Sequence, residues 1–219
     1  MKMAQVSKEG FQALRIFFTG VGGQGTLLAT RLVGEAVLEE GIPVTMSEIH
    51  GMAQRGGVVE SSVVAGNVFS PTIADGEADI LMAFEPLEAA RAVPKCHAGS
   101  VVIASSVPVV PFTVAIGQSV YPDLETLRES VKIVAGRFIW ADTAALAREA
   151  GSERTANIVM VGMLAGTGLL PVSEKGWQEA LKRVLPARAL EVNRRAFEVG
   201  REFGSSALAG WNAPAAAGT

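Results

Sequence analysis

The residue run with the clearest chemical potential is 20–25, which reads GVGGQG. It follows a short apolar run and precedes a helical pattern, with the G-x-G-x-x-G spacing of turns that hold a dinucleotide phosphate at a helix N-terminus. A dinucleotide site also needs an acidic residue about 20 residues further on to bind the ribose. This sequence places that residue poorly, because residues 45–47 are uncharged and Glu48 comes late. Three interpretations stay open: a phosphate site, a plain strand-to-helix turn, and backbone N–H groups kept for another anion or a partner.

Gln24 stands at the crest of this turn. A glutamine amide offers two donors and an acceptor, and a plain turn does not need one at that position. We therefore assign the turn a ligand-binding or partner-binding role, carried by Gly20, Gly22, Gly23, Gln24 and Gly25.

A second motif, SEIHGMAQRGG, occupies residues 47–57, where the next predicted strand ends. We expect the two strands to be neighbours in a parallel sheet, so that both motifs lie at the edge where ligands dock. An arginine followed by two glycines can present a planar guanidinium to a carboxylate, a phosphate or a partner. The alternative is a surface arginine in a flexible loop. The candidate binding residues here are Ser47, His50, Gln54, Arg55, Gly56 and Gly57.

The sequence offers no convincing catalytic or metal-binding set. Cys96 is the only cysteine, whereas an iron–sulfur cluster needs several thiolates. His97 is adjacent to it, but sequence neighbours rarely face each other as a catalytic pair, and Pro94 and Gly99 predict a turn there. Neither His50 nor His97 has a carboxylate at a metal-ligand spacing. We assign no catalytic residue and no metal site.

The elements that must position the two motifs follow from hydrophobic periodicity. A strand at 15–19, a helix at 26–40 and a strand at 44–49 make a β-α-β unit, which is typical of parallel sheets. Further strands are predicted at 58–65, 78–84, 100–105 and 138–141, and further helices at 87–92, 124–131, 143–150, 157–169, 173–185 and 187–203. The fold class is α/β: a single domain with a doubly wound, mainly parallel, Rossmann-like sheet and a helical C-terminal third. The irregular run 58–71 could add an antiparallel strand.

Composition limits the classes of function. Of the 219 residues, 49% are hydrophobic and 19% charged, which is enough for one core and suits an extra face buried against a partner. The net charge of −3 and the lack of a basic run argue against nucleic acid. The longest apolar stretch, 158–170, is too short to cross a bilayer, and no apolar signal region is visible, so we expect a cytoplasmic protein. We expect a flexible leader at 1–13, the domain at 14–204 and a disordered tail at 205–219.

The two motifs together resemble the gamma-type domain of pyruvate/2-oxoacid:ferredoxin oxidoreductases. Typical members have a glycine-rich turn like residues 20–25 and a serine-started loop ending in Arg-Gly-Gly, like residues 47–57. The His-Gly-Met-Ala-Gln stretch looks most like the beta subunits of the indolepyruvate branch. Residues 155–162 (TANIVMVG) are similar to the family's asparagine-containing helix start. The resemblance covers about residues 14–200.

The resemblance implies a small subunit of a hetero-oligomer that oxidatively decarboxylates an arylpyruvate to an aryl-acetyl-CoA and reduces ferredoxin. It implies that this chain alone binds no cofactor. Thiamine diphosphate, magnesium, iron–sulfur clusters and coenzyme A (CoA) belong mainly to a large alpha subunit. The single cysteine agrees with that division, as does the lack of a G-D-G run followed by asparagine. Two alternatives stay open: a stand-alone dinucleotide-binding dehydrogenase and a ligand-free interaction module.

Overall fold

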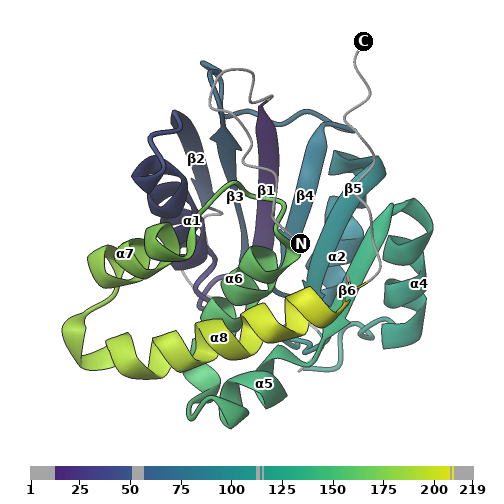
Figure 1. Ribbon diagram of the computed structural model, residues 1–219. Helices are drawn as coiled ribbons and strands as arrows, with labels where there is room; N and C mark the ends of the chain where they lie inside the picture. Colours follow the sequence, from purple (N-terminus) through teal and green to yellow (C-terminus); the bar gives the residue numbers. More distant parts are fainter. Residues whose placement is uncertain (1–12, 51–56, 112–113, 115, 208, 210–219) are drawn as a thin grey trace.

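The computed structural model describes residues 13–50, 57–111, 114, 116–207 and 209. Within this part of the chain, a six-stranded sheet has the order β2-β3-β1-β4-β5-β6 (Figure 1). The strands are β1 (Leu14–Val21), β2 (Val44–His50), β3 (Val58–Ala65), β4 (Ala78–Ala83), β5 (Cys96–Ser105) and β6 (Arg137–Ala141).

The sheet is mainly parallel, as predicted, with an antiparallel part at one edge. β1, β4, β5 and β6 pair in parallel, whereas β3 runs antiparallel to both β1 and β2. The prediction that β1 and β2 are neighbours is wrong, because β3 lies between them. The two strands still point the same way, since each is antiparallel to β3, so both end at the same edge of the sheet.

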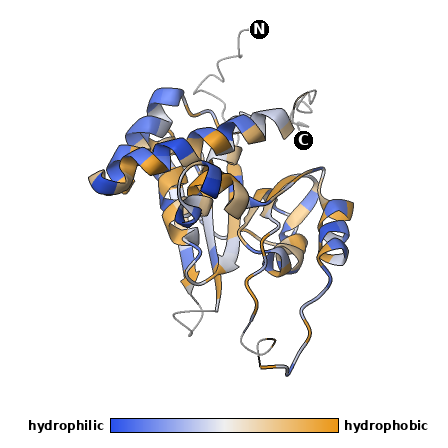
Figure 2. Ribbon diagram, turned by 90° about the horizontal axis from the view of Figure 1, so that it is seen from below, coloured by the Kyte–Doolittle hydropathy of each residue, from blue (hydrophilic) through white to orange (hydrophobic). Residues whose placement is uncertain are grey.

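Helices cover both faces, which confirms the doubly wound architecture (Figures 1 and 2). Strand residues alternate between two cores: Ile16 and Phe18 point to the larger core and Phe17 to the smaller. The larger core is closed by α1 (Thr26–Glu39), α6 (Ala156–Thr167), α7 (Glu174–Val184) and α8 (Leu190–Ala207), with α5 (Thr143–Glu149) beside them. The smaller is closed by α2 (Pro86–Ala92) and α4 (Leu124–Val134). Short 3₁₀ turns are η1 (Val93–Lys95), η2 (Glu153–Thr155) and η3 (Ala187–Ala189).

Two local predictions differ from the structure. Cys96 and His97 begin strand β5 instead of forming a turn. The irregularity that Gly99 indicated is a shift in the pairing register between β4 and β5. Ser100 bridges this shift: its Oγ accepts from His97 N–H at 2.8 Å and donates to the carbonyl of Ala78 at 2.6 Å. At the other end of the chain α8 continues to Ala207, so the first residues of the expected tail are helical. Most of the rest of that tail, and the leader up to residue 12, lie outside the described residues.

The crossing of α6 and α8 is unusually close because glycines line it on both sides. A Cβ added at Gly162 or Gly166 of α6 would overlap a backbone carbonyl of α8, and one added at Gly200 or Gly204 of α8 would overlap a carbonyl of α6. Only glycine permits this approach. The crossing fixes α6, whose first turn faces the carboxyl ends of the strands.

Candidate functional site

The glycine turn links β1 to α1, as the sequence predicts. Gly23 and Gly25 have φ of 108° and 79°, the left-handed region that side chains rarely adopt. Gly20 is required for space, since a Cβ there would lie 2.8 Å from Oγ1 of Thr26 and 3.0 Å from Cβ of Phe84. The backbone of the turn therefore demands glycine at several positions whatever it binds.

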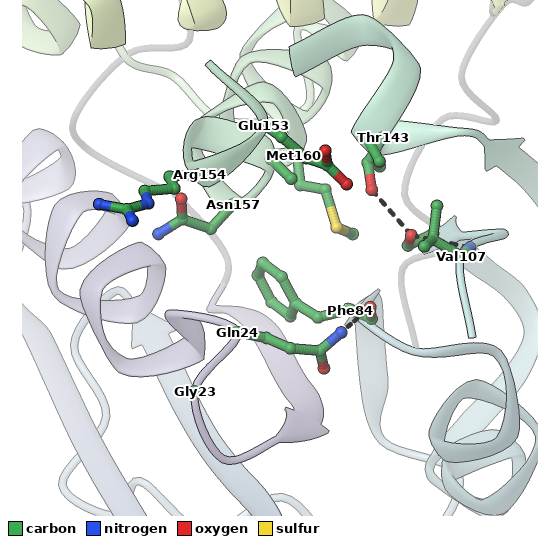
Figure 3. A pocket seen from close by; sticks show the side chains of 12 residues that line it. Gly23, Gln24, Phe84, Val107, Thr143, Glu153, Arg154, Asn157 and Met160 are labelled. Carbon is green, nitrogen blue, oxygen red and sulfur yellow. Dashed lines mark hydrogen bonds between the residues drawn. The ribbon is translucent and has the colours of Figure 1, made fainter. Parts of the chain in front are cut away.

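The side-chain amide of Gln24 is used inside the protein. Its Oε1 accepts from Val21 N–H at 2.7 Å, and its Nε2 donates to the carbonyl of Phe84 at 2.7 Å (Figure 3). These bonds close the turn and tie it to the end of β4. The expectation that Gln24 presents its whole amide outward needs correction, because one donor and one acceptor position are already occupied.

The second motif divides between a strand and residues that the structure does not describe. Ser47 lies within β2, opposite Ser62 of β3, and His50 is the last residue of that strand. Gln54, Arg55 and Gly56 fall outside the described residues, so their binding role stays a prediction. At the end of the motif, the carbonyl of Gly57 accepts from Gly22 N–H at 2.8 Å. The two motifs therefore touch, although β3 separates their strands.

A cavity of about 210 Å³ opens between the glycine turn and the start of α6 (Figure 3). It lies over the carboxyl ends of the strands. At this edge the connections that follow β1 and β4 leave toward opposite faces of the sheet. Ligands often bind where neighbouring parallel strands diverge in this way. Its polar lining comes from Gln24, Ser105, Thr143, Glu153, Arg154 and Asn157. Sequence reasoning did not name Ser105, Thr143, Glu153 or Arg154 as site residues, and it noted Asn157 only within the family's helix start. Ser105 and Thr143 could have been found from their positions, because Ser105 is the last residue of β5 and Thr143 lies just after β6.

Two helices begin at this cavity without a side-chain cap. Neither Gly25 before α1 nor Thr155 before α6 caps its helix. Asn157 links the two starts, since its Nδ2 donates to the carbonyl of Gly25 at 3.3 Å. The remaining α-helices with a described N-cap, α2, α4, α5 and α7, are capped by Glu85, Asp123, Asp142 and Ser173. The N–H of Ala156 at the start of α6 already donates to the carbonyl of Glu153, so the free N–H groups belong mainly to the first turn of α1. These groups and the positive ends of both helix dipoles favour an anion at the cavity.

Nothing among the described lining residues suits proton transfer. The hydroxyls of Ser105 and Thr143 bond to each other at 2.8 Å, and Glu153 pairs with Arg148 at 3.4 Å. The lining includes no histidine, cysteine or lysine. Donors without a general base suit the holding of an anionic group better than acid–base chemistry.

Cys96 lies away from this cavity, in the smaller core. Burial raises the pKa of its thiol to about 11, and a hydrogen bond with Ser100 opposes that shift only in part. The group is therefore a neutral thiol near neutral pH, which fits a structural role and not that of a nucleophile or metal ligand.

Comparison with known proteins places the chain in a family. Residues 15–203 match the family model of pyruvate ferredoxin/flavodoxin oxidoreductases. Indolepyruvate oxidoreductase subunit IorB of Methanothermobacter thermautotrophicus is 40% identical over 88% of this chain and 97% of its own length. The chain belongs to the pyruvate ferredoxin/flavodoxin oxidoreductase family. The IorB subunit of Thermococcus kodakarensis is 38% identical over 84% of this chain and 93% of its own length.

Solved structures of this oxidoreductase family have the same fold. The gamma subunit of a keto/oxoacid ferredoxin oxidoreductase from Geobacter sulfurreducens superposes with a TM-score of 0.65 at 25% identity, covering 89% of this chain and 99% of that subunit. The 2-oxoglutarate:ferredoxin oxidoreductase of Magnetococcus marinus matches with a TM-score of 0.68 at 19% identity, over 90% of this chain and 32% of the other. In the described part of the chain, no helix combines the length and apolarity needed to span a membrane.

Proposed function

We propose that this chain is the small subunit of an indolepyruvate-type 2-oxoacid:ferredoxin oxidoreductase. The observation that carries the proposal is the 40% identity to an indolepyruvate oxidoreductase subunit over 97% of that subunit's length. The complex would convert an arylpyruvate and CoA to an aryl-acetyl-CoA and carbon dioxide, passing two electrons to ferredoxin. We place it in the cytoplasm.

The redox and carbanion chemistry would belong to a large partner subunit. An iron–sulfur cluster does not fit this chain, because Cys96 is its only cysteine and is 7% exposed. The sequence also lacks the G-D-G run followed by asparagine that holds a magnesium pyrophosphate. Thiamine diphosphate, which supplies the carbanion chemistry when bound, and the clusters are therefore assigned to that partner.

The role proposed for this chain is to hold an anionic group at the cavity between α1 and α6. The cavity's volume of about 210 Å³ suits one phosphate or carboxylate and not a whole CoA. The related enzyme of Magnetococcus marinus was solved with 2-oxoglutarate, CoA and succinyl-CoA bound. Of the anionic reactants we favour a CoA phosphate, because two uncapped helix starts meet at the cavity and helix N-termini are ready-made phosphate sites.

Asn157, Arg154 and Gln24 of the lining have defined parts in this scheme. Asn157, which is 7% exposed, already holds the glycine turn against α6 and keeps the two helix starts together. Arg154 is exposed at the edge of the cavity, where its guanidinium can neutralise an entering phosphate (Figure 3). Arg55 and the second N–H of Gln24 would extend the same donor surface toward the partner.

Reconstitution tests the proposal. The chain is co-expressed with a large thiamine- and iron–sulfur-containing subunit from the same source, and the complex is assayed with arylpyruvate, pyruvate and branched 2-oxoacids. We expect CoA-dependent ferredoxin reduction, fastest with arylpyruvate, and no turnover from either chain alone. Turnover by this chain without a partner, or NAD reduction in place of ferredoxin reduction, would reject the assignment and favour the dehydrogenase alternative.

A further inference from the structure

A buried carboxylate stands next to the cavity without lining it. Glu85 comes after Phe84, the first residue beyond β4, and is 1% exposed. Its Oε2 caps α2 by accepting from Glu88 N–H at 3.0 Å. Its Oε1 accepts twice from residues far along the chain, from Val109 N–H at 3.2 Å and from the hydroxyl of Tyr121 at 2.5 Å. One carboxylate therefore joins α2 to both ends of the chain between β5 and α4.

These bonds differ from surface contacts, because the Glu85 carboxylate that accepts them is withdrawn from water. A buried carboxylate is tolerated only when its oxygens are satisfied, and Glu85 receives three donors. Burial raises the pKa of Tyr121 above its ordinary value, and the hydrogen bond to Glu85 raises it further. The hydroxyl thus stays protonated and donates to Glu85.

The segment that Glu85 holds also forms a wall of the cavity. We call residues 106–123 the β5–α4 connection. It starts at the cavity, where Val107 is part of the lining and its N–H donates to Ser105 Oγ at 3.2 Å. Beyond that point the described residues of the connection reach away from the rest of the domain (Figure 2). Val110 and Val120 are 53% and 91% exposed, so apolar burial does little to fix it there.

The opposite wall depends on the neighbouring residue, Phe84. Its carbonyl accepts from Gln24 of the glycine turn at 2.7 Å, and its N–H donates to the carbonyl of Thr19 at 2.9 Å. Two consecutive residues thus set both sides of the cavity: Phe84 holds the glycine turn, and Glu85 holds the Val107 side. A shift of either residue changes the width of the cavity.

We propose that Glu85 is a positioning residue for the anion-binding cavity, acting through Val109 and Tyr121 on the wall that contains Val107. The inference rests on the proposed function, since the ligand it would position is the CoA phosphate of that site. Removal of the carboxylate frees the wall and weakens ligand binding, while the reacting centre on the partner subunit is untouched. The expected signature is a raised KM for CoA with kcat preserved.

The experiment compares variants in the reconstituted complex. Glu85→Ala should raise KM for CoA about tenfold, because misplacing binding groups by about 1 Å is costly, and should leave kcat within about twofold. Glu85→Gln keeps an oxygen that can accept from Tyr121, so it should restore most of the affinity. Tyr121→Phe removes one bond and should have an intermediate effect. Ser173→Ala, which removes the cap of the distant helix α7, is the control for the loss of a helix cap.

Hydrogen exchange of residues 107–111 and 119–121 in the same complexes gives a readout that is independent of the ligand. Faster exchange in Glu85→Ala, together with the KM change and rescue by Gln, supports the inference. Unchanged exchange overturns it, as does faster exchange with an unchanged KM for CoA. Asn157→Ala separates the two proposals: if it raises KM for CoA while Glu85→Ala does not, only the inference about Glu85 falls. If neither variant changes that KM, the proposed CoA site falls as well.

Discussion

The close crossing of α6 and α8 can be tested by a single added methyl group. In Gly162→Ala the new Cβ would overlap the carbonyl oxygen of Phe197 and lie 3.0 Å from the amide nitrogen of Arg201. Both are backbone atoms of α8 and cannot rotate away. Alanine is favoured over glycine in an isolated helix by about 1 kcal/mol, so propensity alone predicts stabilisation. The steric term opposes it, because overpacking a tight contact costs about 1–3 kcal/mol and occasionally more.

We expect the steric term to win, because the two helices must separate along a crossing that buries Met163 and Phe197 completely. The expected net loss is about 1–3 kcal/mol in the free energy of unfolding, measured by denaturant titration with an unchanged slope. The matched control is Gly34→Ala in α1, where the three atoms nearest the new Cβ all belong to the side chain of Met46, which is flexible and 44% exposed. That variant should stay within about 1 kcal/mol of the wild type. If Gly162→Ala is as stable as Gly34→Ala, the helices are not held at this distance and the packing argument is wrong.

Three further outcomes are expected. Gln24→Ala should lower stability by about 1–3 kcal/mol, because it leaves the Phe84 carbonyl and the Val21 N–H without their partner; an unchanged melting temperature would contradict this. Arg55→Ala should weaken assembly or raise KM for CoA or the 2-oxoacid without changing the melting temperature, and unaltered assembly and kinetics would remove the second motif from the site. Cys96, with a pKa of about 11, should resist thiol reagents at neutral pH in the folded chain and react rapidly once the chain is unfolded in denaturant; rapid labelling of the native chain would contradict its burial.

The spacing of apolar residues located most helices and strands, because that pattern lies within each element's own segment of sequence. The helix predicted at 26–40 is Thr26–Glu39, and the strand predicted at 58–65 is Val58–Ala65. The order of strands could not be obtained in this way. The placement of β3 between β1 and β2 depends on pairing between segments about 40 residues apart, such as Phe18 with Ser61, which no local pattern reveals.

The candidate site was predictable only where it is continuous in sequence. The glycine turn was identified from its spacing, but the inward bonds of Gln24 depend on Phe84, 60 positions away. Ser105 and Thr143 reach the cavity from the ends of β5 and β6, and Arg154 reaches it from the turn η2 before α6. Each of the three looks ordinary in its own segment. The family resemblance carried the functional prediction further than the residues alone, since the fold by itself does not specify a reaction.

The α6–α8 crossing also has a consequence for biosynthesis. Asn157, which joins the glycine turn to the cavity, belongs to α6, and α6 is fixed against α8, the last helix of the described chain. While the C-terminal residues are still being translated, α6 lacks the partner that seats it, although every strand of the sheet has already emerged. The nascent chain can therefore assemble its sheet before its cavity. A partner subunit that recognises the finished cavity edge would engage the chain only after α8 has left the ribosome and packed against α6, so this crossing would act as a checkpoint on assembly.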